Sequence, residues 1–83
     1  MTANKPIYHF QVGDRIEITS VELQDVMRRR LLDLGFVPGT VIEVVQKSPL
    51  GDPLAFKVFN TTIALRKEES SLIYGKKVYK EVV

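Results

Sequence analysis

Few side chains in this 83-residue chain could do chemistry. It has one histidine, His9, and no cysteine. Imidazole and thiolate are the ligands that most transition metals favour, and covalent catalysis needs a nucleophile placed beside a base. His9 has no serine or carboxylate partner at a recognisable spacing, and we expect it at the surface near a mobile terminus. The sequence therefore predicts no catalytic residue, no metal site, no cofactor and no enzyme activity.

Neither the carboxylates nor the glycines form a recognisable site. Glu22, Asp25, Glu68 and Glu69 are expected to lie on solvated faces. The chain has no Gly-x-x-x-x-Gly-Lys-Ser/Thr and no Gly-x-Gly-x-x-Gly pattern, which are the patterns that cradle phosphates. Its isolated glycines are typical of turns, so we expect no nucleotide to bind.

The run Arg28, Arg29 and Arg30 is the densest charge in the sequence. Successive residues of a helix turn by about 100°, so three guanidinium groups in a row spread around it and form no single flat patch. One interpretation is that they are solvated arginines near the end of a helix. The other is that Arg28 and Arg29 meet an acidic surface of a partner protein.

Leu50 is the most informative single residue, because Pro49 and Gly51 flank it in a stretch that cannot continue a strand. It could fold back onto the protein body. Alternatively it could project as an apolar partner-binding residue with a polar rim. We predict that Pro49, Leu50 and Gly51 bind a partner, with Arg28 and Arg29 as a second contact.

Length predicts one small domain, residues 1–83, because 83 residues fall below the roughly 100–200 that a domain usually has. Hydrophobic residues make up 45% and charged residues 27%, an ordinary globular balance. The absence of cysteine suits a reducing cytosol, and no apolar run is long enough for a signal peptide or a membrane span. We expect a cytoplasmic protein without direct membrane insertion.

Nucleic-acid binding is not expected from the charge pattern. Twelve basic residues stand against ten acidic ones, for a net charge of +2. RNA-binding barrels more often interleave aromatic and basic residues on one strand face. Here Phe56 and Phe59 fall on opposite faces, with only Lys57 between them as a basic residue.

Periodicity predicts the elements that position these residues. Alternation predicts strands over 12–18, 40–46, 54–59, 62–66 and 72–74, and a further edge strand over 78–83. Helical spacing of Leu23, Val26, Met27, Leu31 and Leu34 predicts one helix with Ser20 as N-cap and Gly35 as its stop. Residues 37–40 suit a type II turn, Asn60 a left-handed turn position, and residues 67–70 one short helical turn. This pattern predicts a mainly β fold, a small SH3-like β-barrel of five to six strands with one helix inserted after the first strand.

Three segments in order carry a family resemblance: Arg30-Leu31-Leu32-Asp33-Leu34-Gly35-Phe36-Val37-Pro38-Gly39-Thr40, then Gly51-Asp52-Pro53, then Thr61-Thr62-Ile63-Ala64-Leu65-Arg66. In these the chain closely resembles the FeoA family over residues 12–73, with residues 74–83 as a C-terminal extension. Departures are Ser70 in place of an alanine, Asn60 in place of a glycine, and the length after Tyr74.

The resemblance implies a non-enzymatic cytosolic accessory of bacterial ferrous-iron uptake that binds FeoB, the membrane iron transporter with a cytosolic GTP-binding domain. It leaves open whether GTP hydrolysis or complex assembly is affected. Two alternatives remain: an SH3-like regulatory module like that at the C-terminus of metal-dependent transcriptional repressors, and an RNA-binding small barrel. Exposed strand edges also leave a homo-oligomer open.

Overall fold

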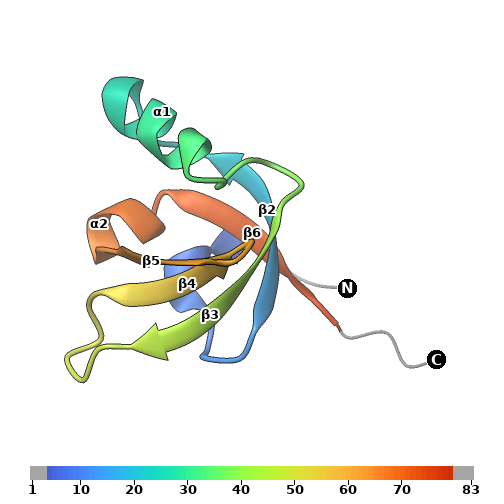
Figure 1. The fold of residues 1–83 in the computed structure, drawn as a ribbon, viewed down its shortest axis with the longest axis vertical. Helices are drawn as coiled ribbons and strands as arrows, with labels where there is room; N and C mark the ends of the chain where they lie inside the picture. The colour runs from blue at the N-terminus through green and yellow to red at the C-terminus, as the bar shows by residue number, and fades with distance from the viewer. Residues whose placement is uncertain (1–3, 80–83) are drawn as a thin grey trace.

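One bent antiparallel sheet forms most of the molecule, with two helices beside it (Figure 1). The computed structural model describes residues 4–79. Its elements are β1 (Lys5–Pro6), η1 (Ile7–His9), β2 (Arg15–Val21), α1 (Asp25–Asp33), β3 (Val41–Lys47), β4 (Leu54–Val58), β5 (Thr61–Leu65), α2 (Lys67–Ser70) and β6 (Ile73–Val78). The six strands lie in the order β1-β6-β2-β3-β4-β5, so β1 and β5 are the two edges. The predicted mainly β fold, with a helix after the first long strand, is confirmed.

The core lies on the concave side of the sheet and follows from strand alternation. Leu54, Phe56 and Val58 share one face of β4 and are at most 1% exposed. Ile16 and Ile18 do the same on β2. The rings of Phe36 and Phe56 meet edge to face with centroids 6.3 Å apart, so the segment after α1 is packed into the same core.

Two glycines lie in the connection from α1 to β3, as predicted. Gly35 ends the helix at a φ of 108°, and a Cβ there would lie 2.7 Å from the Val58 side chain. Gly39 takes a φ of 97°, and the Thr40 N–H donates to the Val37 carbonyl at 3.0 Å, which is the type II turn. Any larger residue at Gly35 would push the helix end off the sheet.

Three local predictions were wrong. Ser20 is no N-cap, because pairing with β6 continues β2 through Val21 and α1 begins at Asp25. The left-handed residue of the β4–β5 turn is Phe59, with a φ of 56°, and not Asn60. The last strand does not stop before Gly75: β6 runs to Val78, and the absence of a Cβ at Gly75 lets it approach β2 closely. The predicted edge strand over 78–83 falls mostly outside the described residues.

The predicted apolar stripe of the helix is mostly not buried. Only Leu31 of α1 is in the core, while Val26 is 81% exposed. Core positions come instead from the N-terminal segment, which the periodicity analysis left outside the fold: Ile7 is fully buried and Phe10 nearly so. In consequence α1 is attached to the body by few side chains.

Candidate functional site: the β3–β4 loop and helix α1

Leu50 projects from the β3–β4 loop, residues 48–53. The loop is closed by the Gly51 N–H donating to the Ser48 carbonyl at 2.8 Å and by the Ser48 N–H donating to the Pro53 carbonyl at 3.1 Å. Gly51 takes a φ of 83°, which a glycine adopts without strain. Leu50 is 93% exposed, so the interpretation in which it folds back onto the body is wrong.

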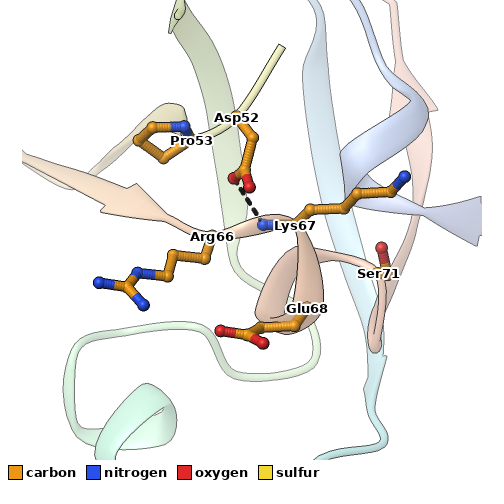
Figure 2. A pocket seen from close by; sticks show the side chains of 6 residues that line it. All are labelled: Asp52, Pro53, Arg66, Lys67, Glu68 and Ser71. Carbon is orange, nitrogen blue, oxygen red and sulfur yellow. Dashed lines mark hydrogen bonds between the residues drawn. The ribbon is translucent and has the colours of Figure 1, made fainter. Parts of the chain in front are cut away.

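The base of this loop is tied to two distant segments. The Tyr8 hydroxyl donates to the Gly51 carbonyl at 3.1 Å, and Oδ1 of Asp52 accepts the Lys67 N–H at 2.8 Å (Figure 2). The Lys67 ammonium in turn lies 5.3 Å from the centre of the Tyr8 ring. A fixed base with a free apolar tip loses little conformational entropy on binding, which favours recognition by a partner.

A shallow hollow lies beside the base of the loop (Figure 2). Its lining combines the loop with α2 and the residues on either side of that helix: Asp52, Pro53, Arg66, Lys67, Glu68 and Ser71. Two cations and two carboxylates line it, and Asp52 is already used as an acceptor for α2. The arrangement has the mixed polar character of an interface rim.

On α1 the three arginines divide into two groups. Arg28 and Arg29 are exposed and line one hollow with Asp25, Leu32 and Asp33. The same hollow is thus lined by two cations and two carboxylates, and among the described residues neither Arg28 nor Arg29 takes part in an ion pair.

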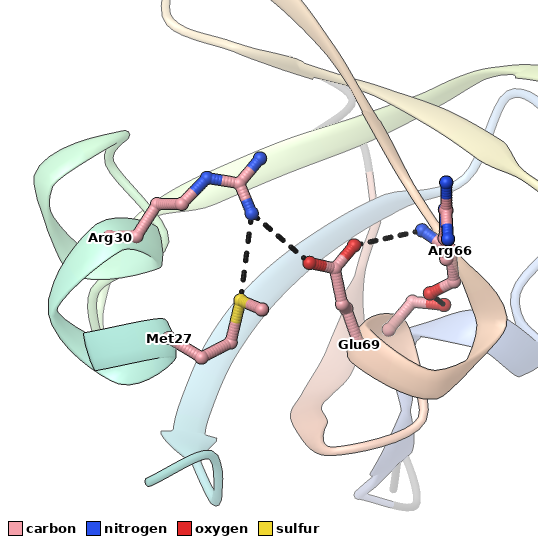
Figure 3. Close-up of polar contacts among 5 residues, drawn as sticks. Met27, Arg30, Arg66 and Glu69 are labelled. Carbon is pink, nitrogen blue, oxygen red and sulfur yellow. Dashed lines mark hydrogen bonds and ion pairs between the residues drawn. The ribbon is translucent and has the colours of Figure 1, made fainter. Parts of the chain in front are cut away.

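Arg30 instead turns toward α2 and pairs with Glu69 at 3.2 Å (Figure 3). The other Glu69 oxygen accepts the Arg66 N–H at 3.1 Å, and the Arg30 guanidinium also lies 3.5 Å from the Met27 sulfur. Glu69 is only 9% exposed, so its predicted place on a solvated face was wrong. Burial of one partner makes this a stronger link than a surface pair.

The two predicted contact regions do not form one surface. Figure 1 shows α1 at one end of the long axis and the β3–β4 loop toward the other, with α2 between them in this view. Pro49, Leu50 and Gly51 are thus together, and Arg28 and Arg29 are together, but the two groups are apart. A single small partner surface would meet one group and not the other.

The remaining polar candidates are scattered. His9 is exposed on η1, with its ring edge to face with Tyr8 at 5.5 Å. Glu22 and Asp25 are exposed. Across residues 4–79, no three histidine, aspartate or glutamate side chains come together in a way that could hold a metal ion. In the same part of the chain, no helix is long and apolar enough to cross a membrane.

The pKa of Asp14 is lowered in the folded protein. The Gln11 N–H donates to Oδ2 at 2.9 Å and lowers the pKa of Asp14. Partial burial opposes this effect, and the Lys77 ammonium, 3.3 Å from Oδ1, adds to it. These contacts hold the turn before β2 against β6.

Solved structures of other proteins share this fold. A *Stenotrophomonas maltophilia* FeoA complexed with zinc, described as a procaryotic SH3 domain protein, superposes with a TM-score of 0.74 at 32% identity, over 90% of this chain and 88% of that one. The six-stranded sheet with its inserted helix is therefore an SH3-like domain, as predicted. A manganese-dependent transcriptional repressor shares the fold alone, with a TM-score of 0.78 at 12% identity, over 94% of this chain and 44% of that one.

The family follows from sequence matches. The FeoA domain model matches residues 5–77, and the chain belongs to the FeoA family. Iron(II) transport protein A from *Clostridium thermocellum* is 38% identical with a TM-score of 0.84, over 88% of this chain and 45% of that one. A fusion of Fe(2+) transport protein A with the Fe(2+) transporter FeoB from *Porphyromonas gingivalis* is 41% identical over 61 residues. That match covers 74% of this chain and 7% of the relative, so this chain corresponds to a small part of the fusion.

Proposed function

We propose that this protein is a non-enzymatic, cytoplasmic accessory of bacterial ferrous-iron uptake that binds the cytosolic GTP-binding part of a FeoB-type transporter. Membership of the FeoA family supports the process. The *Porphyromonas gingivalis* relative, in which a FeoA segment and FeoB share one chain, supports the partner. Linking two proteins raises the effective concentration of one at the other, which benefits proteins that act on each other.

The tip of the β3–β4 loop is our proposed docking element, and the exposure of Leu50 is the observation that carries it. An apolar side chain 93% exposed on a tethered base gains most from burial in a partner pocket. Arg28 and Arg29 lie elsewhere, so we assign them to long-range attraction of an acidic surface. Such charges change the association rate more than the affinity.

Calorimetric titration with the purified GTP-binding domain of a FeoB tests this assignment. Leu50→Ala should weaken binding at least tenfold while the Tm stays within about 3 °C, because surface truncations rarely cost more than ~0.5 kcal/mol. Leu72→Ala is a matched control, since Leu72 is also exposed, at 40%, but lies between α2 and β6. Equal losses in the two variants would exclude the loop tip as the docking element.

Association kinetics test the role assigned to Arg28 and Arg29. Replacing both by Glu should slow association with the GTP-binding domain and reduce the salt dependence of the association rate.

The same protein preparation separates the two alternative functions. Tight, salt-sensitive binding of single-stranded RNA, with no binding to the transporter domain, would favour an RNA-binding barrel. Against that outcome, Phe56 is fully buried and unable to stack on a base. The regulatory-module alternative shares the fold, and binding to the transporter domain would count against it.

A further inference from the structure

The two edges of the sheet differ in how they are protected. The β1 edge has two residues, Lys5 and Pro6, and proline has no N–H to donate. The β5 edge has five residues, Thr-Thr-Ile-Ala-Leu, with no charge and no proline. Exposed edge strands usually carry such a guard against pairing with other chains. The β5 edge has none.

Hydrogen-bond alternation shows which backbone groups of β5 point outward. Val44 bonds on the β2 side: its carbonyl accepts the Gly13 N–H at 2.7 Å and its N–H donates to Asp14 at 3.0 Å. Groups on successive residues of a strand point to opposite sides, so Glu43 bonds toward Lys57 of β4.

The same alternation carries across β4 to the edge. Phe56 and Val58 then bond toward Ile63 and Thr61 of β5. The N–H and C=O groups of Thr62 and Ala64 must therefore point away from the sheet. Within residues 4–79, neither residue makes a backbone hydrogen bond to a segment outside the strand pairs.

The side chains beside this edge leave room for another strand. Thr62 and Ala64 are exposed on the convex face, opposite Lys57 and Ala55 of β4. The two alanines belong to a small hollow lined by Gln46, Ser48, Pro53, Ala55 and Ala64. A side chain of an added strand could lie over these alanines, as pockets beside strand-addition sites allow.

The charged residues beside β5 favour one kind of added strand. Lys57 lies opposite Thr62, and Arg66 follows Leu65 directly. Among the described residues, neither takes part in an ion pair; the pairs there are Arg30 with Glu69 and Lys77 with Asp14. Two copies paired antiparallel through β5 would bring Arg66 of one toward the end that carries Lys57 of the other. An acidic segment would be attracted electrostatically at both of its ends, whereas a second copy of this chain would be attracted at neither.

We propose that the β5 edge is a strand-addition site for an extended segment of another protein that carries acidic residues at both ends. The backbone groups of Thr62 and Ala64 supply the hydrogen bonds, and Arg66 and Lys57 select the acidic ends. Ser48 and Pro53 of the β3–β4 loop line its hollow, but Leu50 does not, so this proposal can be tested independently of docking through Leu50.

Amide hydrogen exchange on the whole protein tests the site, with the peptide Glu-Thr-Val-Thr-Val-Thr-Val-Thr-Glu as probe. In dilute protein the amides of Thr62 and Ala64 should exchange rapidly, and saturating peptide should slow them at least tenfold. Ala64→Pro should abolish this protection, since it removes an outward N–H, and Ala64→Ser is the matched control that keeps it. Arg66→Glu should weaken the peptide about threefold, because Lys57 remains to attract only one of its two acidic ends.

Three results would overturn the proposal. One is slow exchange of Thr62 and Ala64 in dilute protein without peptide, which would show that the edge is already covered. Another is protection that rises with protein concentration alone, because the occupant would then be a second copy. The last is a peptide that protects amides of α1 or the β3–β4 loop in place of β5. Because wild-type exchange gives all three readings, the test holds even where Ala64→Pro fails to fold.

Discussion

The β3–β4 loop and helix α1 both extend from the sheet, but they are attached in opposite ways. The loop has no regular structure, and yet Tyr8 and the Lys67 N–H fix its base by hydrogen bonds to Gly51 and Asp52. The helix is regular, and yet its side-chain attachments are buried Leu31, partly buried Leu32 and one ion pair, Arg30 with Glu69. Regular secondary structure is therefore no guide to which projection is held rigidly. Contacts between distant segments decide that.

The largest expected effect concerns the apolar attachment of α1. Leu31→Ala should lower the free energy of unfolding by about 2–5 kcal/mol, since it removes the buried side chain of the helix and leaves a cavity. Val26→Ala, on the same helix but 81% exposed, should change it by less than about 0.5 kcal/mol. Urea denaturation of both variants measures this, and similar values would show that α1 does not depend on Leu31.

The polar attachment of α1 should come next. Glu69→Ala removes the acceptor of both Arg30 and the Arg66 N–H, and we expect a loss of about 1–3 kcal/mol in unfolding free energy. Glu69→Gln should lose less, because an amide oxygen can still accept from Arg66. Glu68→Ala, at an exposed neighbouring position, is the control. Thermal melts of the three variants measure these losses. An equal loss of unfolding free energy in all three would argue against the link between the helices.

The loop tether should have a smaller effect on stability and a clear one on motion. Asp52→Ala should cost about 0.5–2 kcal/mol, the range for losing an acceptor at a helix start, while Asp52→Asn should cost less. Amides of residues 48–53 should exchange faster in Asp52→Ala, and those of α1 should not change. Faster exchange in α1 as well would show that the two projections are coupled.

The smallest effect is a pH dependence that neither projection explains. Because the pKa of Asp14 is lowered in the folded state, the unfolded chain takes up this proton more readily. The stability that the contacts of ionised Asp14 contribute is thus present above the ordinary pKa of 3.8 and is lost as pH falls below it. In Asp14→Asn, denaturation between about pH 5 and pH 2 should show a shallower pH slope. An unchanged slope would mean that other carboxylates account for it.

Local patterns predicted the sheet well and the site only in part. Alternation predicted the strand that contains Leu54, Phe56 and Val58, and the Pro-Gly turn at residues 37–40 was predicted with its left-handed glycine. Leu50 was found as a candidate because its flanking Pro49 and Gly51 exclude a strand. These features depend on neighbours in the sequence, which a single chain displays directly.

What the sequence could not show are contacts between distant residues. Arg30 and Glu69 are 39 positions apart, so Glu69 looked like a solvated acid. His9 was expected near a mobile terminus, although Ile7 and Phe10 on either side of it are buried in the core. The helix stripe misled because helical spacing shows which residues share a face, and not whether anything covers that face.

The hydrogen bond from Tyr8 to Gly51 spans 43 positions and joins the start of the described chain to its most exposed loop. A protease that trimmed the chain past Tyr8 would therefore change the dynamics of a loop it never touched. Such trimming would also remove the buried side chain of Ile7, so the loop and the core would be weakened together.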